Sequence, residues 1–149
     1  MATLADPAAL AQLVERLRRL TPAQTRAWGT MSPQQMASHL GDASAAVLKQ
    51  REFSATPRKP NPLRRLLVLY VLSRLPRGVR SGADPAAKQL DPGAFASDVE
   101  RAVALLNQLA AAPPESLAQR HPVFGAMSRK NWMRWAYMHT DHHLRQFGL

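Results

Sequence analysis

Apolar residues recur at helical spacing along most of the chain, and the first stretch shows the pattern clearly. Its apolar positions are Leu10, Leu13, Val14, Leu17 and Leu20. They lie three or four residues apart, which is the period of a helix with one buried face. Asp6 and Pro7 precede them, and an acidic N-cap followed by proline is typical of a helix start. The pattern predicts an amphipathic helix that begins at Pro7.

A second helix is predicted after Ser32, where Gln35 can close a capping box. Its inner face carries Met36, His39, Leu40, Ala43, Ala46 and Val47. The apolar pattern fades near residues 49–51, where we expect the helix to end.

Two more long helices follow later in the chain. Asp91 and Pro92 repeat the first start signal ahead of a long amphipathic stretch, which Pro113 stops. Ser128 caps a last helix that runs to about Phe147. No stretch alternates with period two for long enough to indicate a strand. The sequence therefore predicts an all-α fold, built as a four-helix bundle.

Residues 51–90 form an insertion between the second and third helices of this bundle. Prolines and basic residues indicate loops at both of its ends, whereas Leu63 to Leu75 is interpreted as a helix that is apolar on every side. Such a helix must be covered on more than one face, either by lying across the bundle or by contacting a second subunit. We interpret residues 1–149 as a single domain that includes this insertion.

The chain has a formal net charge of +10, from 20 Lys and Arg against 10 Asp and Glu. Much of the excess lies in the insertion, at Arg51, Arg58, Lys59, Arg64, Arg65, Arg74, Arg77 and Arg80. A solvated basic face is the simplest interpretation, and a surface for an anion or an acidic partner is the alternative. Nucleic acid is disfavoured, because few aromatic residues interleave with these cations and no nucleic-acid-binding motif is present.

The chain contains no cysteine, which excludes disulfides, thiolate metal ligands and a cysteine nucleophile. Its first residues lack the basic region and apolar run of a secretion signal. The longest wholly apolar run, residues 66–72, is far shorter than the ~18 residues that a membrane span needs. We therefore expect a cytoplasmic protein without a membrane span.

Histidines supply the candidate chemistry. Three of the five lie close together in the last predicted helix, and His139 and His143 are four residues apart. These two share one helix face, where two imidazoles can bind the same metal ion. His142 lies to one side of that face and is a weaker candidate ligand. The simpler alternative is that the pair is hydrogen-bonded within the core, as inward-facing histidines usually are.

His39 lies on the inner face of the second predicted helix. If that helix neighbours the last one, His39 completes a three-histidine site with His139 and His143. Three neutral nitrogen ligands leave a position open for water or substrate, as in catalytic metal sites. The candidates to orient the imidazoles from a second layer are Gln35, Asp42, His142 and Gln146.

Other residues could lie near this site. Arg134 and Arg145 could hold an anionic substrate, or could be solvated. The Trp132–Trp135 pair is interpreted as core rather than as a platform for a substrate. His121, which precedes a proline in a loop, is interpreted as structural or incidental.

The arrangement resembles the DinB/YfiT-like superfamily of metalloenzymes, whose members are four-helix bundles. In that superfamily one metal histidine lies on the second long helix and two, spaced H-x3-H, lie on the last. The segment from Met36 to Leu40 resembles the second-helix motif, and His139 to His143 resembles the last-helix motif. His121 to Gly125, together with the carboxy-terminal string HTDHHLRQFG, resembles an uncharacterised branch of the superfamily.

The resemblance implies a divalent transition metal (Zn, Ni or Fe) held by His39, His139 and His143, in a fold that often forms homodimers. It also implies a small-molecule substrate. Characterised relatives include transferases and isomerases that use a low-molecular-weight thiol, and hydrolase-like members. The insertion at residues 51–90 departs from several relatives and could cover the mouth of the site.

Two other functions fit the same sequence. In one, the protein is a non-enzymatic binding module whose basic helix contacts an acidic partner. In the other, it is a structural homodimer with a vestigial site.

Overall fold

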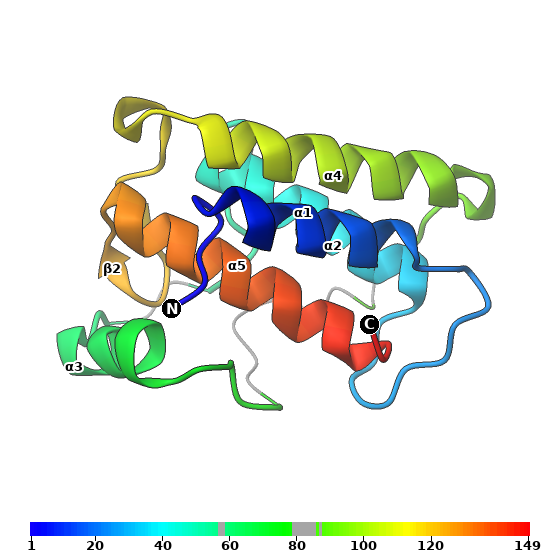
Figure 1. Cartoon of the computed structure of the whole chain (residues 1–149), viewed down its shortest axis with the longest axis horizontal. Coiled ribbons are helices and arrows are strands. Elements are labelled where there is room, and N and C mark those ends of the chain that lie inside the picture. Colours follow the sequence, from blue (N-terminus) through cyan, green and yellow to red (C-terminus); the bar gives the residue numbers. More distant parts are fainter. Residues whose placement is uncertain (57–58, 79–85, 87) are drawn as a thin grey trace.

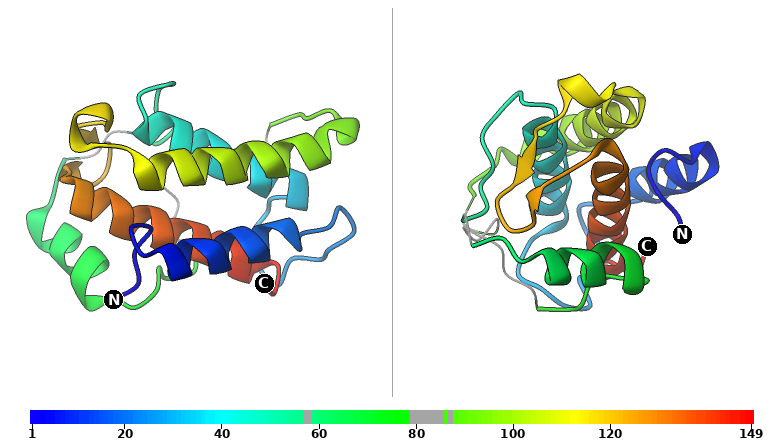
Figure 2. Two further views of the ribbon diagram at one scale, coloured as in Figure 1. Left: turned by 45° about the horizontal axis from the view of Figure 1, so that its top comes forward. Right: turned by 90° about the vertical axis from the view of Figure 1, so that its left-hand side faces the viewer.

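A computed structural model of the chain describes residues 1–56, 59–78, 86 and 88–149. Its long helices are α1 (Pro7–Arg18), α2 (Pro33–Val47), α4 (Phe95–Ala111) and α5 (Arg129–Gln146). They run along the molecule as one bundle (Figure 1), and α1 and α2 each contact both α4 and α5. The view along the bundle in Figure 2 shows the helices around a common interior. The predicted all-α bundle is therefore confirmed.

The helix starts follow the capping signals in the sequence. The Asp6 side chain accepts a hydrogen bond from the Ala8 amide, and Ser128 accepts one from Asn131. Ser32 and Gln35 form the predicted capping box at the start of α2. Each cap satisfies amide groups that the first helical turn leaves without a partner.

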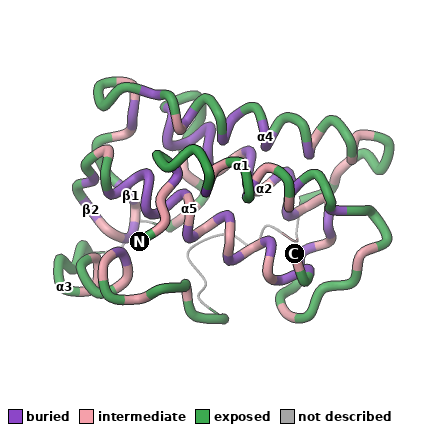
Figure 3. Tube along the Cα trace, in the orientation of Figure 1, coloured by how far each residue is buried: buried purple, intermediate pink, exposed green. Residues whose placement is uncertain are grey.

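The core lies between the inward faces of the four long helices, which Figure 3 shows as buried stretches along the trace. Its largest fully buried side chains include Leu13, Leu17, Met36, Leu40, Leu106, Leu109, Trp132 and Leu144. Most residues of helix α5 are buried, and they include the polar Asn131, Arg134, Thr140 and His142. Because α5 is enclosed in this way, its polar side chains must find partners inside the protein.

The insertion contributes a short helical segment that lies across α5. Helix α3 (Pro62–Leu66) continues into a π-helical turn, η1 (Leu67–Val71), so the helix ends before the predicted Leu75. Leu69 is fully buried against the bundle, as expected for a helix that lies across it. The opposite face is uncovered, with Leu63 and Val71 exposed by 72% and 64%. Two of the basic residues in the insertion, Arg58 and Arg80, lie outside the residues that the structure describes.

A small hairpin, which the sequence did not indicate, precedes α5. Strands β1 (Arg120–His121) and β2 (Gly125–Ala126) pair antiparallel, and two residues each are too few to show a period of two. Gly125 has φ of +72°, and a Cβ there would lie 2.9 Å from the Pro60 side chain. Both the turn and the close approach therefore require glycine. Two single 3-10 turns, η3 (Pro92–Ala94) and η4 (Pro114–Ser116), complete the described elements.

Arg134 connects three parts of the chain from inside α5. Its buried guanidinium donates hydrogen bonds to the carbonyls of Leu69, Leu72 and Ala2 at 2.9–3.0 Å. These bonds hold the insertion and the amino terminus against α5, and two of them satisfy carbonyls at the end of η1. Arg134 is therefore neither solvated nor available to a substrate. Arg145, the other candidate, pairs with Asp141.

Within the described chain, no helix is both long enough and apolar enough to cross a membrane.

Replacing Arg134 with methionine should loosen the insertion. Hydrogen bonds from a charged donor contribute about 1.5–3 kcal/mol each, so the free energy of unfolding should fall by at least about 2 kcal/mol. Trypsin should cleave after Arg64, Arg65 or Arg74 faster than in the wild type. Arg129→Met is the matched control, because Arg129 binds the carbonyls of Ala110 and Ala112 instead. Equal cleavage rates in the two variants would contradict this role of Arg134.

Candidate metal centre

Three histidines converge between α2 and α5. His39 extends from α2, and His139 and His143 extend from successive turns of α5. The Nε2 atom of His139 lies 3.2 Å from Nε2 of His39 and 3.2 Å from Nε2 of His143. The three potential ligand atoms lie within 4.8 Å of one another. The fold thus brings together the three residues that the sequence analysis grouped.

The separation of the nitrogens fits a shared metal ion. Ligand nitrogens at 2.0–2.1 Å from a tetrahedral ion lie about 3.3 Å apart, close to the 3.2 Å that separates Nε2 of His139 from Nε2 of His39 and of His143. Hydrogen bonds alone satisfy these three nitrogens poorly. In a neutral ring, Nε2 of His139 carries at most one proton, and that proton cannot be donated fully to both neighbouring nitrogens. The donor set and its spacing therefore fit a divalent transition metal.

The cluster favours neutral imidazoles, the form that binds a metal. Burial lowers the pKa of His39 to about 4, although Asp42 opposes the shift. Burial also lowers the pKa of His139 and His143 well below 6.5, and mutual repulsion among the three rings adds to the effect. All three rings are therefore uncharged near neutral pH.

Two contacts orient the imidazoles on α5. Nδ1 of His143 lies 2.8 Å from Oε1 of Gln146, and since an amide oxygen only accepts, His143 carries its proton on Nδ1. Its Nε2 lone pair is then free for a metal. Trp135 stacks on His139 with ring centroids 4.6 Å apart. Gly29 allows the Gln146 amide to approach closely, since a Cβ at that position would lie 2.7 Å from Nε2 of Gln146.

The other orienting candidates lie further from the rings. Gln35 uses its side chain in the capping box and donates to the carbonyls of Ala86 and Lys88. His142 directs Nδ1 toward the Leu75 carbonyl at 3.4 Å and meets His143 only at the ring edge. Neither side chain has a hydrogen bond to the three histidines within the described structure.

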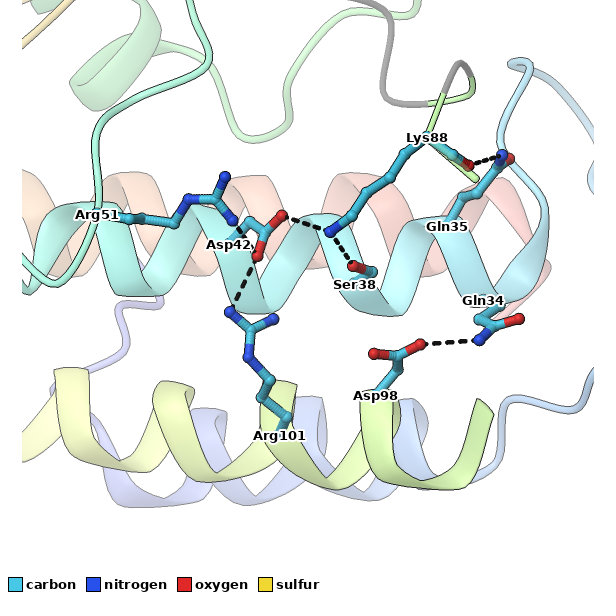
Figure 4. A network of polar contacts seen from close by, with 8 residues as sticks. All are labelled: Gln34, Gln35, Ser38, Asp42, Arg51, Lys88, Asp98 and Arg101. Atoms are coloured by element: carbon cyan, nitrogen blue, oxygen red, sulfur yellow. Dashed lines mark hydrogen bonds and ion pairs between the residues drawn. The ribbon is translucent and has the colours of Figure 1, made fainter. Parts of the chain in front are cut away.

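Asp42 is the centre of a polar network beside the cluster (Figure 4). Its carboxylate forms ion pairs with Arg51, Lys88 and Arg101, and Lys88 also donates to Ser38. Partial burial alone would raise the pKa of Asp42, but the hydrogen bonds from Lys88 and Arg101 outweigh it and lower that pKa. Asp42 therefore acts on His39 through its charge and not through a direct hydrogen bond.

A small pocket opens beside the cluster. Its volume is about 50 Å³, and its wall includes His39, His139, Trp135, Phe53, Arg51 and His121. Residues 51–55, at the start of the insertion, form one side of it. The insertion thus covers part of the mouth of the site, as the sequence suggested.

His121 is the pocket residue that the sequence analysis undervalued. It is 6% exposed and lies among the rings of Phe53, Phe124, Trp132 and Trp135. The available sequence signal was a histidine three residues before a phenylalanine in the loop ahead of the last helix. Its position beside α5 depends on tertiary contacts that spacing does not reveal.

The sequence profile of the DinB superfamily matches residues 6–147. The chain belongs to the DinB superfamily. No functionally curated protein and no solved structure matches it significantly. The match covers all four long helices and all three clustered histidines of this DinB-superfamily protein.

Without metal, this protein should lose stability as the pH falls from 6.5 to about 4.5. Burial lowers the pKa of both His39 and His121 to about 4, so over this range protons bind preferentially to the unfolded chain and favour unfolding. Each shift corresponds to about 3 kcal/mol once the pH reaches the folded-state pKa. The depressed pKa of Asp42 affects stability only at lower pH, near and below its ordinary value of 3.8.

Urea unfolding in a chelating buffer, repeated between pH 4.5 and 7.5, measures this dependence. The His121→Asn variant removes one contribution and leaves those of the three clustered histidines, so its curve should be shallower. A free energy of unfolding that stays constant from pH 7.5 to 4.5 would contradict the assignment of buried neutral histidines.

Proposed function

We propose that the protein binds one divalent transition metal ion through Nε2 of His39, His139 and His143 and is a metal-dependent enzyme of the thiol-transferase or hydrolase type. The observation that supports this most directly is the convergence of the three imidazoles: Nε2 of His139 lies 3.2 Å from Nε2 of both His39 and His143, and all three ligand atoms lie within 4.8 Å of one another. Their lowered pKa values keep the rings neutral, and membership of the DinB superfamily agrees with the proposal.

Bound to three neutral imidazoles, a divalent ion keeps its positive charge and lowers the pKa of a bound water or thiol. Since the chain has no cysteine, any thiol must come from a small molecule. Gln146 sets the proton of His143 on Nδ1, and Trp135 fixes the plane of His139. The pocket beside His39 and His139 gives a small-molecule substrate access to the site. Zinc, nickel and iron all suit three imidazoles.

The contacts of the insertion favour this enzyme over a basic binding module. Arg64 and Arg65 donate to the carbonyls of Val123 and Ala126 in the hairpin. Arg77 lies 4.1 Å from the centre of the Trp28 ring. Three of the arginines expected to contact an acidic partner therefore have contacts within the chain.

A homodimer and a cytoplasmic location belong to the same proposal. The uncovered apolar face of α3 and η1, which includes Leu63, Leu66, Leu67 and Val71, supports contact with a second copy. Burying such a face removes apolar surface from water.

Metal content tests the proposed ligands. Wild-type protein dialysed against zinc and then against buffer should retain about one ion per chain, measured by mass spectrometry. His39→Ala, His139→Ala and His143→Ala should each retain little. His142→Ala is the matched control on the same helix and should retain most of the metal. Equal retention in all four variants, or none in the wild type, would refute the site.

Gln146→Leu tests the orienting contact separately from the ligands. Losing the partner of a metal-bound histidine typically costs 10–100-fold in metal affinity, so zinc should bind roughly that much more weakly, as measured by competition with a chromogenic chelator. Gln35→Leu removes an amide that lies away from the rings and should leave zinc affinity unchanged. If both variants bind zinc like the wild type, Gln146 has no orienting role.

A further inference from the structure

Residues 51–55 form one wall of the pocket beside the histidine cluster. The rest of the lining comes from α2, α5 and the hairpin, and it includes His39 and His139. The pocket has a volume of about 50 Å³, which holds only a few heavy atoms. A low-molecular-weight thiol is larger than this. Such a substrate therefore reaches the histidines through the pocket only if part of the wall moves.

The elements around the pocket differ in how firmly they are held. Helices α2 and α5 are long and contribute many buried side chains to the core. The hairpin is paired, and Arg64 and Arg65 donate hydrogen bonds to its carbonyls. Residues 51–55 lie outside the helices. A segment of this kind rearranges at a lower cost in free energy than a packed helix does, so it is the part of the wall best suited to move.

Arg51 attaches this segment to α2. Its guanidinium forms an ion pair with Asp42, which lies one turn beyond His39, and all three residues line the pocket. Figure 4 shows Arg51 reaching Asp42 from the start of the insertion, whereas Arg101 reaches the same carboxylate from α4. The Arg51–Asp42 ion pair therefore holds the segment to the helix beside the cluster.

The contacts that hold the segment are of a kind that can break and re-form. The side chains of Arg51 and Asp42 are 43% and 18% exposed, and ion pairs near the surface contribute little free energy and are weakened by salt. Inside the wall, Phe53 stacks on Trp132 with ring centroids 5.8 Å apart. An ion pair and a stacked ring keep the segment closed without fixing it as firmly as a helix.

We propose that residues 51–55 are a lid over the three-histidine cluster and that the Arg51–Asp42 ion pair is its latch. Release of the latch lets the segment move away from His39 and His139 and widens the pocket. The use of this lid by a substrate rests on the proposed function, whereas the opening itself requires no metal ion. Arg51 and Asp42 are positioning residues and not catalytic ones.

A thiol placed under the lid reports its opening in metal-free protein. The chain has no cysteine, so Ala46→Cys supplies a single thiol, at a position in the pocket wall that is 3% exposed. The uncharged disulfide dithiodipyridine should react with it slowly, because the reaction requires access to the thiol. Adding Arg51→Gln should raise the reaction rate about fivefold, the factor expected from losing one partly exposed ion pair.

Matched variants and salt separate the latch from a general loss of stability. Arg101→Gln removes a cation from the same carboxylate without changing residues 51–55, so the rate should stay near that of Ala46→Cys alone. Arg51→Lys keeps the charge and should keep the reaction slow. Raising the ionic strength from about 0.01 to about 1 M screens the ion pair. Salt should therefore accelerate the reaction of Ala46→Cys and have little effect once Arg51→Gln is added.

Three outcomes would overturn the lid. The first is an equal reaction rate with and without Arg51→Gln, and the second is an equal acceleration by Arg101→Gln. The third is a thiol that reacts in folded Ala46→Cys as fast as in the unfolded chain, because the segment would then cover nothing. If Ala46→Cys does not fold, as judged by circular dichroism, Ala43→Cys places the thiol in the same pocket wall.

Zinc transfer connects the lid to the metal site. In the chain without an added thiol, Arg51→Gln should pass zinc to a chromogenic chelator about fivefold faster than the wild type, because the chelator must reach the ion. Its zinc affinity should stay nearly the same, since the three histidines are unchanged. An unchanged transfer rate would overturn the control of access by the lid. A wild type that binds no zinc would refute the proposed function instead, and the thiol reaction would still decide whether the lid opens.

Discussion

The burial of three uncharged imidazoles between α2 and α5 is the constraint on which the rest of the site depends. Nε2 of His139 lies 3.2 Å from Nε2 of His39 and of His143, and the three ligand atoms lie within 4.8 Å of one another. Protonation is disfavoured there, because burial and mutual repulsion lower all three pKa values. Lone pairs that are brought together, kept neutral and shielded from water interact most favourably with a shared cation. The fold must hold two helices at a fixed separation to maintain this arrangement.

Contacts away from the histidines maintain that separation. Helix α2 packs closely on α4, where a Cβ at Gly41 would lie 2.8 Å from the Arg101 guanidinium. Arg101 in turn binds Asp42, one turn beyond His39. On α5, Asp141 pairs with Arg145 and with Arg16 of α1. Ion pairs therefore connect both ligand-bearing helices to their neighbours.

Local sequence predicted what depends on local structure. The helices and their inner faces were predictable because they depend on residues close together in the sequence. The signals were the caps at Asp6, Ser32 and Ser128 and the four-residue spacing of the histidines in the last helix. The contact of His39 with His139 and His143 depends on helix packing between segments about a hundred residues apart in the sequence. The family resemblance suggested this contact, whereas periodicity could not. At the early end of the inserted helix, the carbonyls of Leu69 and Leu72 accept hydrogen bonds from Arg134, which is more than sixty residues away in the sequence.

The two halves of the site differ in what supports them. The clustered histidines lie on long helices whose packing leaves little freedom, whereas the pocket wall comes from residues 51–55 and from the hairpin that carries His121. Loops accept substitution more readily than packed helices do. Changes at Phe53 or Arg51 would alter the shape and charge of the pocket without moving the imidazoles. The shape of the pocket can therefore vary separately from the three-histidine cluster, because the two are built from different elements.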